Sequence, residues 1–126
     1  MKQLSIILLI SIIPIFMGCN EIIFSMNDSG KTITVDPGTV IKINLVSNRS
    51  TGNSWRTINY NHEIIAQQGE PEYKKSSSNM VGAAGSVSYT FKTLKSGTTN
   101  LSMLYGSFSD PDKEPVKKFD LKIVVK

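Results

Sequence analysis

Residues 86–92 read SVSYTFK, in which polar and apolar side chains alternate without a break. In an extended strand Val87, Tyr89 and Phe91 would share one face, with serine, threonine and lysine on the other. The same two-residue period marks three further runs: Ile41–Leu45, Leu101–Tyr105 and Phe119–Val125. Helical spacing is almost absent after residue 30, so the sequence predicts an all-β fold.

Turn-forming residues separate these runs. Asp36-Pro37-Gly38-Thr39 is a predicted turn, because proline restricts its own φ and the glycine after it can adopt a positive φ. Ser96-Gly97 predicts a second turn between two later runs. Shorter apolar runs at residues 33–35, 55–60 and 64–65 bring the expected total to seven or eight strands. This number of short strands in about 100 residues is typical of an antiparallel β-sandwich. The last run, apolar and strand-like, is expected inside a sheet.

The chain opens MKQLSIILLISIIPIFMGCN, a lysine followed by an apolar stretch that has the length and flanks of a signal peptide. Met17-Gly18-Cys19 resembles the bacterial lipobox, with Phe16 where leucine is usual. The prediction is a signal peptide over residues 1–18, a lipidated Cys19 with a tether over 19–29, and one domain over 30–126. The protein would be exported and lipid-anchored to a membrane of the bacterial cell envelope. The alternative is a secreted protein in which Cys19, the only cysteine, is a free thiol.

Charge argues against nucleic-acid binding. The chain carries 14 basic and 10 acidic residues, a net charge of +4. The basic residues are scattered apart from Lys74-Lys75 and Lys117-Lys118, whereas nucleic-acid binders gather them on one face. The predicted export of the protein also argues against a nucleic-acid partner.

The sequence holds no clear set of catalytic residues. His62, the only histidine, lies between Asn61 and Glu63 and is expected on the surface. No nucleophile-elbow motif, phosphate loop or dinucleotide fingerprint occurs. Asp110, Asp112 and Glu114 could offer oxygens to calcium, but the segment lacks the glycine and the distal glutamate of an EF-hand loop, so an acidic solvated loop is expected. The sequence predicts no enzyme, no cofactor and no metal site.

Three segments are too long or too rich in glycine and serine for tight hairpins: residues 48–54, 76–85 and 106–115. The first belongs to NRSTGNSW (48–55), a polar run that ends at the only tryptophan. Trp55 can bury its ring and find a partner for its N–H, which would clamp one end of the loop. Asn48 can hydrogen-bond nearby backbone at the other end, leaving Thr51-Gly52 as a projecting tip.

These loops resemble those of the chagasin-like inhibitors of cysteine peptidases. Asn48, Thr51, Gly52 and Trp55 match the family's first loop, while Arg49 replaces proline. Further departures in that loop are Ser50 for threonine and Asn53 for an aromatic residue. The second loop, Gly82-Ala83-Ala84-Gly85, is similar to the family's Gly-x-Gly-Gly. The third lacks the usual Arg-Pro-Trp, and Tyr105 and Phe108 are the nearest aromatic candidates.

The resemblance implies an immunoglobulin-like β-sandwich that inhibits papain-like cysteine peptidases, acting as a monomer with three loops in the active-site cleft. Thr51 would block the nucleophile, and the second loop would pair with backbone at the edge of the cleft. The expected peptidase-binding residues come from all three loops: Asn48, Ser50, Thr51, Gly52, Asn53, Trp55, Gly82, Ala83, Ala84, Gly85, Tyr105 and Phe108.

A different class of function stays open at this point. Because a fold does not fix a function, the same scaffold could be a non-inhibitory adhesion or ligand-binding module. A small hydrolase is disfavoured, since His62 has no evident partners.

Overall fold

The computed structural model describes residues 20–75, 84–110 and 112–126. Nine strands and two 3-10 turns occur there in this order: β1 (Glu21–Phe24), η1 (Met26–Asp28), β2 (Thr32–Val35), β3 (Val40–Ser47), η2 (Arg49–Thr51), β4 (Asn53–Asn59), β5 (Ile65–Gln67), β6 (Glu72–Lys74), β7 (Gly85–Thr93), β8 (Gly97–Ser107) and β9 (Lys117–Val125). The predicted signal peptide, Cys19, Gly82 and Ala83 lie outside the described residues.

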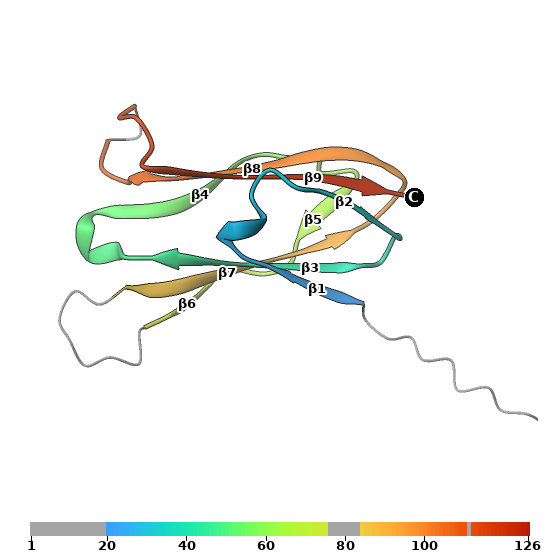
Figure 1. Cartoon of the computed structure of the whole chain (residues 1–126), viewed down its shortest axis with the longest axis horizontal. Helices are drawn as coiled ribbons and strands as arrows, with labels where there is room; N and C mark the ends of the chain where they lie inside the picture. The colour runs from blue at the N-terminus through green and yellow to red at the C-terminus, as the bar shows by residue number, and fades with distance from the viewer. Residues whose placement is uncertain (1–19, 76–83, 111) are drawn as a thin grey trace, which may run out of the picture.

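Two sheets face each other as the layers of a sandwich (Figure 1). The first sheet has the order β1-β3-β7-β5, with β6 paired to another part of β7, and the second has the order β2-β9-β8-β4. The predicted all-β sandwich is therefore confirmed, with β9 inside its sheet as expected. Two details differ from the predicted antiparallel sandwich of seven or eight strands. The described residues form nine strands, and β1 pairs with β3 and β2 with β9 in parallel.

Strand β1 corrects the prediction of a tether over residues 19–29. Its four residues pair with β3 from Glu21↔Val40 to Phe24↔Ile43, and Phe24 is buried. The carbonyl of Asn20 accepts a hydrogen bond from the Val40 amide at 2.9 Å. A run of four residues is too short to show a period in the sequence, so only its partner strand reveals it as part of the fold.

The core forms where the alternating runs of the two sheets meet. Ile41, Ile43 and Phe91 from the first sheet are fully buried, as are Leu121 and Ile123 from the second. The opposite faces of these strands carry mostly polar residues, with valine at positions such as Val46, so the two-residue period correctly predicted which side chains are buried. His62 is exposed, as expected.

The order of strands gathers functional candidates at one end of the sandwich. Strands β3, β6 and β8 all end there, and β4, β7 and β9 all begin there (Figure 1). The start of β1, the β2–β3 turn and the C-terminus lie at the opposite end (Figure 1). The described ends of the three segments that the sequence left outside strands therefore lie at the same end of the sandwich.

Replacing Phe24 by alanine tests whether β1 belongs to the core. The side chain is buried, so its loss should lower the free energy of unfolding by about 3 kcal/mol or more, as for other buried phenylalanines. Urea denaturation of the chain from Asn20 onward measures this. Ile23→Ala is the matched control because Ile23 is 60% exposed, and its effect should stay within about 0.5 kcal/mol. Equal, negligible effects of both changes would mean that residues 20–29 are a tether after all.

Candidate functional site

The first loop, Asn48–Gly52, folds as a single capped 3-10 turn. Asn48 is the N-cap of η2, and its Oδ1 accepts a hydrogen bond from the Ser50 amide at 3.2 Å. Thr51 donates from Oγ1 to the Asn48 carbonyl at 2.7 Å, and Asn53 Nδ2 donates to the same Oγ1 at 3.3 Å. Side chains thus satisfy backbone groups that a lone turn would leave unpaired.

Gly52 closes this turn in a conformation that other residues rarely adopt. Its φ is +79°, in the left-handed region, and its amide donates to the Arg49 carbonyl at 3.1 Å. Glycine is favoured there because it has no Cβ to clash with the backbone. The side chain of Thr51 beside it is exposed, as predicted for the tip.

Trp55 anchors the exit of the loop, as the sequence predicted. Its side chain is buried in strand β4, and Nε1 donates to the Val46 carbonyl on β3 at 2.9 Å. This hydrogen bond ties the strand that leaves the loop to the strand that enters it. A buried indole with its N–H satisfied is a stable anchor.

Tyr105 anchors the entry of the loop, which corrects its assignment as a contact aromatic. The residue is only 6% exposed, and its ring packs against Trp55 with centroids 5.2 Å apart. Its hydroxyl accepts from the Asn48 amide at 3.0 Å and donates to the Asn48 carbonyl at 3.2 Å. Tyr105 therefore positions the first loop instead of offering its ring to a partner.

The third loop, residues 108–116, joins the first at its tip. The Phe108 amide donates to the Gly52 carbonyl at 3.2 Å, and the Val116 amide donates to the Tyr105 carbonyl at 2.8 Å. Phe108 is 60% exposed, so it can contact a partner. Val116, 62% exposed at the other end of the loop, is a second apolar candidate that the sequence analysis missed. A single valine between Pro115 and Lys117 gave no signal in the sequence.

Part of the second loop lies outside the described residues, including Gly82 and Ala83. Ala84 is exposed immediately before β7, and Gly85 is the first residue of that strand. A Cβ at Gly85 would collide with the backbone carbonyl of Lys74 on β6. The glycine predicted as a contact residue is thus also required for β6 and β7 to pair closely.

A second tyrosine supports the anchor of the first loop from the opposite sheet. The Tyr89 hydroxyl on β7 donates to the Trp55 carbonyl at 3.1 Å. Burial raises the pKa of Tyr89 far above its ordinary range, and the neighbouring Tyr73 hydroxyl raises it further. The hydroxyl therefore stays protonated as a donor at physiological pH.

Metal-binding geometry is not found in the part of the chain that the structure describes. No three His, Cys, Asp or Glu side chains come together there. None of the helical segments within residues 20–75, 84–110 and 112–126 is long and apolar enough to span a bilayer.

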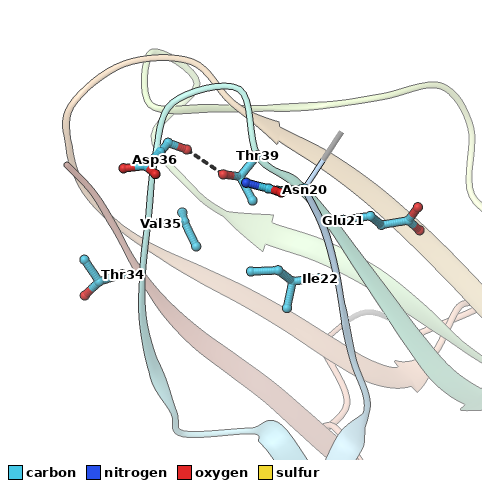
Figure 2. A pocket seen from close by; sticks show the side chains of 7 residues that line it. All are labelled: Asn20, Glu21, Ile22, Thr34, Val35, Asp36 and Thr39. Atoms are coloured by element: carbon cyan, nitrogen blue, oxygen red, sulfur yellow. Dashed lines mark hydrogen bonds between the residues drawn. The ribbon is translucent and has the colours of Figure 1, made fainter. Parts of the chain in front are cut away.

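A hollow of about 470 Å³ lies at the opposite end, between β1 and the segment from β2 to β3. Figure 2 shows Asn20, Glu21 and Ile22 on one side of it and Thr34, Val35 and Asp36 on the other. Thr39 closes the end of the hollow and donates from Oγ1 to the Asp36 carbonyl at 2.7 Å (Figure 2). It is far along the strands from the loops and shares no residue with them.

The structure is thus a small two-sheet β-sandwich whose first loop is a turn capped by the side chain of Asn48. Residues 34–123 match the model of the chagasin family peptidase inhibitor I42. The chain therefore belongs to the chagasin family, which is a family of inhibitors and not of enzymes. Comparison with curated protein sequences gives no significant match.

Solved structures share the fold at low sequence identity. The cysteine protease inhibitor EhICP2 from Entamoeba histolytica is 23% identical, with a TM-score of 0.72 over 84% of this chain and 95% of that one. Amebosin is 22% identical, with a TM-score of 0.68 over 86% of this chain and all of that one. PbICP-C, solved in complex with falcipain-2, is 14% identical, with a TM-score of 0.63 over 86% and 92%. The expected immunoglobulin-like sandwich is thereby confirmed.

Removing the hydroxyl of Tyr105 tests its role as the anchor of the first loop. Tyr105→Phe loses both hydrogen bonds to Asn48 and should lower the free energy of unfolding by about 1–2 kcal/mol. Tyr60→Phe is the control, since the Tyr60 hydroxyl makes no hydrogen bond within the described residues, and it should be close to neutral. Urea denaturation of both variants gives the comparison. Two neutral variants would contradict the anchoring role.

Proposed function

We propose that this protein inhibits papain-like cysteine peptidases by placing the first loop across their catalytic groove. Membership of the chagasin family supports an inhibitor, and the relative PbICP-C forms a complex with falcipain-2. The observation that carries the proposal is the hydrogen-bonded turn at Thr51-Gly52, with Thr51 exposed, between two buried aromatic anchors. Such a tip can lie over a catalytic cysteine without offering it a well-placed peptide bond.

The stiffness of the loop favours tight binding. A loop that is ordered before binding loses little conformational entropy in the complex, so more of the contact energy appears as affinity. Gly52 adds to this because its lack of a side chain lets the backbone of the partner approach closely. Asn48 serves the same end by accepting from the Ser50 amide, and Asn53 does so by donating to Thr51 Oγ1.

The apolar contact of the third loop comes from Phe108 in this proposal. Its exposed ring stands beside the first loop, because its own amide is bonded to Gly52. Aromatic side chains often anchor interfaces, so Phe108 would cover the surface next to the groove. The peptidases that bind best would then be those with an apolar wall at this position.

Thr51→Arg should abolish most of the inhibition while leaving the fold intact. The larger charged side chain would clash at the centre of the interface, and we expect the inhibition constant for papain to rise roughly ten-fold or more. Because Thr51 is exposed, the free energy of unfolding should change by less than about 0.5 kcal/mol. Thr98→Arg, on the exposed face of β8 toward the other end, is the control and should inhibit normally. Unchanged inhibition by the Thr51 variant would rule out this loop as the inhibitory element.

We further propose that Cys19 is lipidated and that the protein is held on a membrane of the bacterial cell envelope. The leader sequence supports this, with Gly18-Cys19 after an apolar stretch. Because β1 begins at Glu21, the lipid would join the sandwich directly, at the end opposite the three loops (Figure 1). The loops would then point away from the lipid surface and stay accessible to a peptidase. The inhibitor would act as a monomer, with one copy binding one peptidase.

Cys19→Ser tests the anchor in a bacterial host. The unchanged protein should appear in the membrane fraction and incorporate labelled palmitate, whereas the variant should lose the label because it has no thiol to acylate. Ser29→Cys in the variant background is the matched control: it returns a cysteine at the wrong place and should not restore labelling. Labelling that persists in Cys19→Ser would disprove lipidation at this residue.

A further inference from the structure

We propose that Arg49 and Tyr73 form a latch that holds the first loop in its binding-competent position. The guanidinium carbon of Arg49 lies 4.7 Å from the centre of the Tyr73 ring. This is within the distance of about 6 Å at which a cation is attracted to an aromatic face. The pair joins the first turn of the inhibitory loop to a strand that follows it by more than twenty residues in the chain.

The position of Tyr73 makes it a fixed support. Tyr73 lies opposite Val87 in the β6–β7 pair, and Val87 is fully buried. Since directly opposite residues share a face of the sheet, the Tyr73 ring is on the inner side, at the open edge of the sandwich. It is 46% exposed there, so one part of the ring is packed and another part is open to Arg49.

The latch connects the first loop to the first sheet, whereas the buried anchors Trp55 and Tyr105 connect it to the second. Strand β7 lies between β6 and β3 in the first sheet, so the Arg49 side chain crosses the start of β7 to reach Tyr73. Tyr105 and Trp55 hold the loop toward the second sheet, where β8 and β4 pair. The contact with Tyr73 holds the same loop toward the first sheet.

A tie of this kind matters because η2 has only three residues. A single 3-10 turn has poor hydrogen-bond geometry and is not stable by itself. Contacts with its surroundings therefore decide how fully the tip is ordered before binding. Arg49 is consequently a positioning residue, acting on affinity through the order of Thr51 and Gly52.

A proline at position 49 could order the turn without the contact to Tyr73, and this substitution therefore tests the latch. Arg49 occupies the first position of η2, where proline is favoured because that amide has no partner within the turn. The preceding residue must be extended for proline to fit, and Asn48 has φ −119° and ψ 91°. Arg49→Pro should therefore order the turn without Tyr73.

The experiment compares Tyr73→Ala in the natural and the Arg49→Pro backgrounds, using the chain from Asn20 onward, which contains both sheets. In the natural background Tyr73→Ala should raise the inhibition constant for papain about two- to five-fold, the range that an exposed cation–aromatic contact supports. In the Arg49→Pro background it should have no effect. Tyr73→Phe, which keeps the aromatic face, should inhibit normally. Lys74→Ala, which removes a neighbouring cation on the opposite face of β6, should also be neutral.

Amide exchange in the free protein provides a readout that does not depend on inhibition. The Gly52 amide is bonded to the Arg49 carbonyl, so its exchange should quicken in Tyr73→Ala and return to normal when Arg49→Pro is added. If the natural protein fails to inhibit papain but this pattern holds, the proposed function is wrong and the latch is right. If Tyr73→Ala leaves Gly52 exchange unchanged, or weakens inhibition equally in both backgrounds, the latch is overturned.

Discussion

The first loop is held in place by hydrogen bonds from two aromatic side chains that are themselves part of the core. The indole of Trp55 bonds the Val46 carbonyl, and the hydroxyl of Tyr105 bonds both polar backbone groups of Asn48. Each ring contributes a large buried apolar surface and a polar group at its edge. Backbone groups at the end of the sandwich need partners, and these rings supply them without giving up burial. The position of the tip therefore depends on the same contacts that stabilise the two sheets.

The N-terminal segment links the sheets at a different place. Strand β1 joins the edge of the first sheet, η1 turns the chain, and β2 then joins the edge of the second. Both additions are parallel, and each buries one apolar residue, Phe24 or Val35. The two strands cover edges that would otherwise present unpaired backbone groups to other chains. Neither β1 nor β2 contributes a residue to the loops, so the pairing of these two strands does not depend on the sequence of the loops.

At the loop end of the sandwich, the residues that hold the loops in place differ from the residues that are exposed to a partner. Buried Trp55, Tyr89 and Tyr105 carry the hydrogen bonds, whereas exposed Thr51 and Phe108 are free of core packing. A binding surface of this kind can change its exposed residues at little cost to the fold. The absence of Arg-Pro-Trp from the third loop is consistent with this division, because that loop is secured through its backbone amides at Phe108 and Val116.

The sequence alone determined the sandwich, the long strands and the first loop. Their information is local. A two-residue period over five or more residues determines which side chains are buried, and Asn48 and Gly52 constrain the backbone of the turn they flank, while Trp55 is the one large apolar side chain beside it. Only the tertiary structure decided that residues 21–24 are a strand, that Tyr105 supports the loop, and that Arg49 meets Tyr73. Short strands such as β1 and β6 exist because a longer partner supplies their hydrogen bonds. A contact between an aromatic ring and a side chain far away in the sequence depends on how the sheets pack. The spacing of residues along the chain does not encode such a contact.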